Sequence, residues 1–299
     1  MTSTTPESGR PARRRPPVPH LATVTASRRI PGGMVRLTLR PAIPVSGMGL
    51  EFTDHYIKLL FPPAGASWSW EDPTVDPATL RETLPRDQWP VMRTYTLRSW
   101  DADANTVDVD FVVHGDAGLA GPWAATVEPG ARIAFAGPGG SWRPSPEVSR
   151  FIFAGDEAAA PAILAAVEAL PAGSSAEVFL EEEDADHELE IPVPASGAQV
   201  RIHRVHRNGA IHGSELVRAV TASGLAAEQG ASWFVHGVAE MIRDLRRYLF
   251  VDNGVPKSDV SISGYWRLGM IEDEWQAGKR EFNAEIEAAE AAAGDQAAR

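Results

Sequence analysis

The 299-residue sequence contains no cysteine. Disulfide bonds, thiolate zinc sites and cysteine-ligated iron–sulfur clusters are therefore excluded. Any redox activity would need an organic cofactor to carry the electrons. The chain also lacks an apolar run near the ~20 residues that span a bilayer, so we expect no membrane insertion. Its N-terminus has no apolar core typical of a secretory signal, which predicts a cytoplasmic location.

Positive charge is scarce, with 28 lysines and arginines against 40 acidic residues and a net charge of −12. This balance argues against a nucleic-acid partner, which needs a basic face. The acidic run over residues 181–186 is interpreted as a solvated surface. Three arginines at 13–15 lie among prolines and polar residues, so residues 1–18 are predicted to be a disordered arm. A basic docking arm is the alternative, and its role stays open.

The first half of the chain has the period-two alternation of β-strands. Residues 35–40 and 107–111 alternate apolar and polar side chains most clearly. Glycine, proline, aspartate and asparagine separate the candidate strands, and one helical stretch is predicted over residues 119–127. The strand candidates cover residues 20–30, 33–40, 54–61, 92–100, 107–114 and 132–136. Many short strands with turn signals predict a β-barrel or sandwich over residues 19–145.

The second half alternates strands and helices. We expect strands at residues 151–154, 176–180, 199–206, 233–237 and 260–262. We expect helices at residues 158–170, 214–222 and 239–251. This order predicts a parallel sheet covered on both faces, and the domain is assigned to residues 146–275. A long Glu/Ala-rich helix is expected after about residue 272, with residues 276–299 as a helical tail.

Residues 93–98 (RTYTLR) carry the first candidate for chemistry. On a strand, Arg93 could pair with a diphosphate as a planar cation. Tyr95 could stack on a ring, and Thr96 could hydrogen-bond a ring heteroatom. The alternative is an ordinary strand with surface arginines. Residues 118–124 form a second candidate, because small residues at a helix start let a phosphate approach backbone N–H groups. Its alternative is a turn with Trp123 in the core.

These motifs resemble the FAD-binding domain of siderophore-interacting proteins, the ferric-siderophore reductases of the ferredoxin-reductase-like superfamily. The motifs are residues 93–98 (RTYTLR), 110–115 (DFVVHG), 121–124 (GPWA) and 137–138 (GP). Residues 155–163 (GDEAAAPAI) resemble the opening of the family's nicotinamide domain. Residues 263–269 (SGYWRLG) resemble its C-terminal signature. The resemblance covers roughly residues 20–275. It implies a Greek-key FAD-binding barrel followed by a parallel-sheet, nicotinamide-binding-like domain.

The resemblance also implies roles for individual residues. The flavin and its ribityl-phosphate would be lined by Arg93, Tyr95, Thr96 and Leu97. The isoalloxazine or ribityl region would lie along Val112, His114 and Gly115. The diphosphate would be held by Ala120, Gly121, Pro122, Trp123 and Ala124. The nicotinamide side of the cofactor site would contain Asp156, Glu157 and Trp266. Ala158 and Ala160 depart from the family's usual pattern, which leaves nicotinamide use open and makes ferredoxin an alternative donor.

The implied function is FAD-dependent reduction of a ferric siderophore, with iron released as Fe(II) and electrons taken from NADH, NADPH or ferredoxin. The basic residues implied in siderophore binding are Lys58, Arg143 and Arg267. No catalytic side chain is assigned. No metal ligand is assigned either, because His203 and His206 would face opposite sides of a strand and could not bind one ion together. His236, at the carboxyl end of a predicted strand, is a candidate nicotinamide contact.

Several choices stay open at the level of the sequence. The acidic run at residues 181–183 would repel a 2′-phosphate and leans towards NADH. A monomer is expected. Two other functions compete with siderophore reduction. One is a flavin reductase or diaphorase with a different acceptor, and the other is a non-catalytic siderophore-binding or iron-storage accessory protein.

Overall fold

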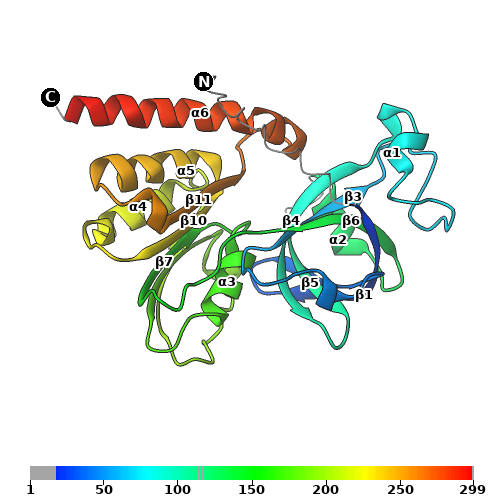
Figure 1. Ribbon diagram of the computed structural model, residues 1–299, viewed down its shortest axis with the longest axis horizontal. Helices are drawn as coiled ribbons and strands as arrows, with labels where there is room; N and C mark the ends of the chain where they lie inside the picture. Colours follow the sequence, from blue (N-terminus) through cyan, green and yellow to red (C-terminus); the bar gives the residue numbers. More distant parts are fainter. Residues whose placement is uncertain (1–17, 114, 116–117, 298–299) are drawn as a thin grey trace, which may run out of the picture.

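A computed structural model of the chain describes residues 18–113, 115 and 118–297. The predicted arm over residues 1–18 falls outside this part except for Val18, and so does His114. Figure 1 shows two bodies side by side, a barrel drawn in blue to green and a sheet with helices drawn in green to orange. Among the helices of the described part, none combines the length and apolarity needed to cross a bilayer.

The first body is a closed antiparallel barrel, which confirms the predicted barrel. Its strands are β1 (His20–Ile30), β2 (Met34–Pro41), β3 (Tyr56–Phe61), β4 (Val91–Asp101), β5 (Thr106–Val112) and β6 (Arg132–Gly139). Neighbouring strands follow the order β1-β2-β5-β4-β3-β6, and β6 closes back on β1. Alternation places Leu37, Val109 and Phe111 inside, each with no exposed surface. The seven-residue helix α2 (Ala120–Thr126) adds Ala120 and Ala124 to this core.

The long connection between β3 and β4 was not anticipated from the sequence. It contains the short helix α1 (Leu80–Thr83) and the 3-10 turn η2 (Arg86–Gln88), and it projects from the barrel in Figure 1. A further 3-10 turn, η1 (Val45–Gly47), precedes β3. Trp70 ties the connection down, because its buried indole N–H donates to the Leu60 carbonyl at 2.6 Å.

The second body is a five-stranded parallel sheet, as predicted. Its strands are β7 (Arg150–Gly155), β8 (Ser175–Glu182), β9 (Gln199–His206), β10 (Ser232–Val238) and β11 (Val260–Trp266), in the order β11-β10-β7-β8-β9. Helix α3 (Ala160–Glu168) covers the face that also packs on barrel residues, including Met34. Helices α4 (Ser214–Ser223) and α5 (Ala239–Arg246) cover the other face. The π-helix η5 (Arg247–Asp252) extends α5, and 3-10 turns η3 (Ala185–His187), η4 (Leu225–Ala227) and η6 (Lys257–Asp259) complete the set.

Two features join the bodies. Arg98 of β4 is 7% exposed and forms a two-pronged pair with Glu168 of α3, at 2.7 and 2.8 Å. The C-terminal helix α6 (Glu272–Ala297) starts beside the barrel and runs along the sheet body (Figure 1). Trp275 and Phe282 of α6 are buried in a cluster with Ala239, and this cluster anchors the helix to α5.

Candidate functional site

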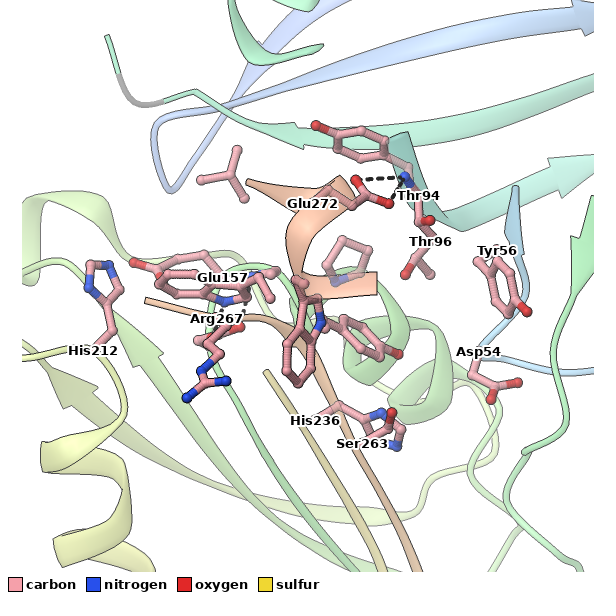
Figure 2. Close-up of a pocket in the computed structure, with 18 of the residues that line it drawn as sticks. Asp54, Tyr56, Thr94, Thr96, Glu157, His212, His236, Ser263, Arg267 and Glu272 are labelled. Atoms are coloured by element: carbon pink, nitrogen blue, oxygen red, sulfur yellow. Dashed lines mark hydrogen bonds between the residues drawn. The ribbon is translucent and has the colours of Figure 1, made fainter. Parts of the chain in front are cut away.

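A cavity of about 1070 Å³ lies between the two bodies. Strands β3 and β4 form its barrel wall, and the carboxyl ends of β7, β10 and β11 form its sheet wall. The start of α6 also lines it, and Figure 2 shows residues from all three parts pointing into it. Open parallel sheets bind ligands at the carboxyl ends of their strands, so this position is typical of a ligand site.

Strand β4 gives the barrel wall an open edge. Its residues 91–96 pair with β3, but its pairing with β5 runs only from Leu97 to Asp101. The second edge of β4 before Leu97 therefore carries backbone groups that no barrel strand pairs. Thr94, Tyr95 and Thr96 line the cavity at this edge. The Tyr95 ring packs 4.3 Å from Phe111, and burial raises the pKa of its hydroxyl.

Arg93 and Leu97 are the other β4 residues that were predicted to contact the flavin, and their side chains are not part of the cavity lining. Arg93 does not line the cavity; its guanidinium donates to the Met92 carbonyl at 2.6 Å and to Asp273 at 3.1 Å. Leu97 has no exposed surface, so its side chain belongs to the barrel core. Only its backbone could face a ligand. Val112, at the end of β5, does line the cavity.

The predicted diphosphate segment, residues 120–124, lies next to the end of β5 and outside the cavity lining. A Cβ on Gly121 would stand 3.1 Å from the Val112 carbonyl oxygen, so glycine allows the helix start to approach this strand closely. The Trp123 ring packs edge-on against Phe61 at 5.2 Å and is half-buried. Gly115 is exposed with a φ of 54°. Pro122 is half-buried in the first turn of the helix.

Two lysines line the same cavity. Lys58 comes from β3 and Lys279 from α6, and within the described part of the chain neither forms an ion pair. Lys279 donates to the Ser263 hydroxyl at 3.1 Å. Burial lowers the pKa of the Lys279 ammonium, and the charge of Lys58 lowers it further. Lys279 could not be assigned to this site from the sequence, because only the fold brings α6 to the cavity.

The two arginines that were predicted to bind the siderophore, Arg143 and Arg267, lie in different hollows of the structure. Arg267 lines the same cavity, with its guanidinium 3.5 Å from Glu240 and stacked over the Phe282 ring at 4.8 Å. Arg143 is exposed and lies in a different hollow of about 490 Å³ between Leu50 and Pro171. The structure therefore brings Lys58, Lys279 and Arg267 together and leaves Arg143 apart.

Asp156 is the most enclosed group of the sheet wall. It has no exposed surface, and its two carboxylate oxygens accept four N–H groups. The donors are the backbone N–H groups of Ala158, Ala159 and Val238 and the indole N–H of Trp266, at 2.8 to 3.2 Å. Burial and the nearby Glu157 charge raise the pKa of Asp156 to about 7, against the effect of these donors. Asp156 thus fixes the start of α3, the end of β10 and the Trp266 ring together.

The acidic run at residues 181–186 was expected to form a solvated surface, which holds for residues 183–186 but not for its first two glutamates. Glu181 and Glu182 have no exposed surface. Glu181 accepts backbone N–H groups at the start of α4 and lies 3.5 Å from the Arg207 guanidinium. Arg207 also pairs with Glu157 at 3.0 Å, and it lines the cavity. For Glu181 and Glu182 the interpretation was wrong, because a run of charges in the sequence cannot show that Arg204 on β9 and Arg207 after it pair with these two carboxylates.

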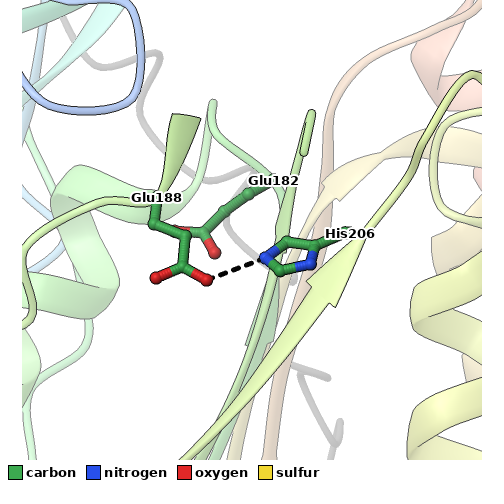
Figure 3. Close-up of side chains that lie close together, drawn as sticks. All are labelled: Glu182, Glu188 and His206. Atoms are coloured by element: carbon green, nitrogen blue, oxygen red, sulfur yellow. Dashed lines mark hydrogen bonds and ion pairs between the residues drawn. The ribbon is translucent and has the colours of Figure 1, made fainter. Parts of the chain in front are cut away.

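One cluster at the edge of the sheet has the composition of a metal site. Glu182, Glu188 and His206 place one ligand atom each within 4.8 Å of one another (Figure 3). The Arg204 guanidinium already pairs with Glu182 at 2.7 Å and with Glu188 at 3.1 Å. An ion-pair network therefore accounts for this arrangement without a cation.

Two histidines line the cavity. His236 ends in the sheet wall, stacked on Phe234 at 3.9 Å, and its Nε2 lies 3.0 Å from the Ser261 hydroxyl. Its Nδ1 is buried with no hydrogen-bond partner among the described residues. Burial lowers the pKa of His236 to about 3, so the ring is neutral at physiological pH. His212 stands edge-on to Trp266 at 5.0 Å.

The barrel, the parallel sheet and the cavity between them define a two-domain protein with a ferredoxin-reductase-like fold. Two family profiles match the chain in sequence. The siderophore-interacting FAD-binding domain matches residues 23–142, and the siderophore-interacting protein domain matches residues 148–269. The chain belongs to the siderophore-interacting protein family.

Known proteins agree with this assignment. An uncharacterized protein of Mycobacterium tuberculosis is 37% identical, over 90% of this chain and 97% of its own length. Ferric vibriobactin reductase of Vibrio cholerae is 33% identical, over 62% of this chain and 68% of its own length. The crystal structure of the siderophore-interacting protein of Aeromonas hydrophila superposes with a TM-score of 0.72 at 26% identity, covering 89% of this chain and 98% of that one.

Proposed function

We propose that this protein is an FAD-dependent reductase of ferric siderophores that releases their iron as Fe(II). The observation that carries the proposal is the single cavity that joins the open edge of β4 to a group of cations, Lys58, Lys279 and Arg267. A site for the cofactor and a site for an anionic substrate would therefore lie in the same cavity. The activity in the name of the Vibrio cholerae relative supports the same assignment.

The residues of the barrel wall fit FAD. The cavity has the size of a large ligand pocket, for which about 300–1,000 Å³ is common. Tyr95, Thr96 and Val112 would hold the ring system along the open edge of β4, and Arg93 and the start of α2 would flank the diphosphate. When bound, FAD supplies the conversion between a two-electron donor and a one-electron acceptor such as Fe(III).

The cations of the cavity would hold the chelate. The protein carries a net charge of −12, so an anionic chelate needs a local positive pocket to approach. Lys58 and Lys279 are charged groups without an ion-pair partner in the described chain, and a bound anion would relieve the repulsion between them. Arg267 extends the positive surface towards the start of α6.

The electron donor is proposed to be NADH, NADPH or ferredoxin. The preference for NADH was based on repulsion of a 2′-phosphate by the acidic residues 181–183. Glu181 and Glu182 are buried and paired, and of this run only Glu183 lines the cavity, so most of that negative charge is not available to repel the phosphate. Arg207 lines the same end of the cavity, but its charge is already shared by Glu157 and Glu181. The Trp266 ring, fixed by Asp156, and the small Ala158 shape the sheet wall where a nicotinamide would enter.

The test is an anaerobic assay of the purified protein with FAD. NADH, NADPH and reduced ferredoxin are supplied in turn, followed by a ferric siderophore and an Fe(II) trap. We expect Fe(II) with at least one donor. In Lys58→Ala and Lys279→Ala we expect the KM for the chelate to rise about tenfold, which corresponds to ~1.4 kcal/mol, with FAD still bound.

Arg143→Ala serves as the matched control, since Arg143 lies in a separate hollow, and its KM should stay unchanged. Reduction of other acceptors but not of ferric chelates would favour a flavin reductase or diaphorase. A protein that binds the chelate but never FAD would favour a non-catalytic accessory role.

A further inference from the structure

The first turn of α6 touches the barrel strand that is proposed to bind FAD. The Glu272 carboxylate accepts the backbone N–H of Thr94, at 2.9 Å through one oxygen and 3.2 Å through the other. Figure 2 shows this carboxylate pointing from α6 to the open edge of β4. The next residue, Asp273, accepts from the Arg93 guanidinium at 3.1 Å. Two neighbouring acids from the C-terminal helix therefore hold one amide and one cation of β4.

Both partners on β4 are groups that an anionic cofactor would use. Thr94 lies on the part of β4 that β5 leaves unpaired, so its N–H needs a partner from outside the barrel. Arg93 is a permanent cation with a planar fork that fits phosphate and carboxylate equally well. A carboxylate and a diphosphate cannot fill the same donors at once. Glu272 and Asp273 thus take the place that an anionic ligand would take.

The contact is confined to the first turn of the helix. Further along α6, Trp275 is 1% exposed and packs with Phe282 in the cluster that anchors the helix. The residues before the turn are open to solvent, with Met270 42% and Ile271 58% exposed. Asp273 is itself half exposed. The Glu272 and Asp273 side chains can therefore release β4 by a local change while the helix, anchored at Trp275, stays docked.

We propose that Glu272 and Asp273 form an internal latch on the flavin strand, which FAD must displace from Thr94 and Arg93 in order to bind. The inference rests on the proposed function, since it takes FAD as the ligand of β4. Lys279 follows Glu272 by seven residues, which is about two helical turns, so the same helix carries the latch and one cation of the chelate pocket. Cofactor loading and the shape of the substrate side would then be linked through α6.

The experiment measures FAD affinity by quenching of flavin fluorescence, with the full-length protein stripped of flavin. The variants are Glu272→Ala/Asp273→Ala and the isosteric pair Glu272→Gln/Asp273→Asn, which guards against misfolding. We expect FAD to bind about tenfold more tightly to the alanine pair and to gain less with the isosteric pair. The control is Glu281→Ala/Glu285→Ala, which removes two exposed acids further along α6 without touching β4 or the first turn, and it separates the latch from a general charge effect.

A second readout needs no cofactor. Hydrogen exchange at the Thr94 amide should be slow in the flavin-free wild type and faster in the alanine pair, with the control pair unchanged. Equal or weaker FAD binding by the latch variants, or an equal gain in the control pair, would overturn the latch alone. Failure of every variant to bind FAD would overturn the proposed function together with the latch.

Discussion

The two walls of the cavity use their polar groups differently. On the sheet wall, the buried charges already have partners: Asp156 accepts four N–H groups, and Arg207 lies between Glu157 and Glu181. On the barrel wall, the open edge of β4 is met only by side chains of α6, and Lys58 has no ion pair within the described chain. The sheet wall is built as a rigid frame, whereas the barrel wall retains groups for a ligand.

The contrast follows from what burial demands. A buried charge is costly unless it is paired and hydrogen-bonded, so the frame of the sheet wall tolerates little change. A strand edge that borders a cavity can exchange one partner for another at small cost. Substitutions on the sheet wall should therefore reduce stability, and substitutions on the barrel wall should mainly change binding.

The largest expected effect is on the free energy of unfolding, when a glycine is replaced by alanine on each of the two walls. Gly237 of the sheet wall has a φ of 143°, and a Cβ there would stand 2.7 to 2.9 Å from the Asp156 carboxylate. Gly237→Ala should cost about 3 to 5 kcal/mol in the free energy of unfolding, from backbone strain and the clash together. At Gly139 of the barrel wall, the three atoms nearest to the Cβ would all belong to the Tyr56 side chain, and Tyr56 is 39% exposed and can move.

Gly139→Ala should accordingly cost less than about 1.5 kcal/mol. Urea unfolding of both variants measures the difference. Gly173→Ala is the control for backbone conformation alone, because Gly173 has a φ of 77° and no atom near the added Cβ. Equal losses at Gly237 and Gly139 would break the contrast between the walls.

The next effect is a pH dependence of the sheet wall. Burial holds the pKa of His236 at about 3, against about 6.5 in the unfolded chain. The unfolded state therefore binds more protons between these values, and stability falls as the pH drops below 6.5. The contribution should amount to about 2 kcal/mol between pH 6 and pH 4.5, at ~1.4 kcal/mol per unit. Urea unfolding across this range should show a shallower loss for His236→Gln than for the wild type, and parallel curves would contradict a neutral, buried imidazole.

The smallest effect concerns the joint between the bodies. The Arg98–Glu168 pair links β4 to α3, with the arginine side chain 8% and the glutamate side chain 46% exposed. A double-mutant cycle with Arg98→Gln and Glu168→Gln should give a coupling energy of about 1 kcal/mol, because one partner is buried and the geometry is two-pronged. The exposed pair Arg150–Glu228, treated in the same way, should give less than about 0.5 kcal/mol. A coupling at Arg98 no larger than this control would mean that the pair does not hold the walls together.

Much of the fold could be read from local patterns. Alternation at residues 35–40 and 107–111 predicted β2 and β5, and the order of strands and helices after residue 150 predicted the parallel sheet. Local patterning carries this information because the side-chain period of a buried face is set by the element itself. It says little about the long β3–β4 connection, where Trp70 folds back to donate a hydrogen bond to Leu60 of β3.

The candidate site was predicted unevenly. Tyr95, Thr96, Lys58 and Arg267 line the cavity, and their binding roles stay predictions, whereas Arg93 is engaged by Asp273 and Arg143 lies elsewhere. Lys279 and Glu272 were missed because they sit in a Glu/Ala-rich helix with no motif of its own. Their position depends on how α6 docks, which long-range packing of Trp275 and Phe282 decides.

By itself, the sequence determined the chemical repertoire of this protein. It has no cysteine for a metal or disulfide, and its alternating strands, glycine turns and family motifs specify a barrel followed by a parallel sheet. Only the tertiary structure decided which charges are available to a ligand. Glu181 and Arg207 neutralise each other in the sheet wall, whereas Lys58 and Lys279 face one cavity. The physical reason is that the state of a charge depends on its neighbours in space, and those neighbours come from segments far apart in the chain.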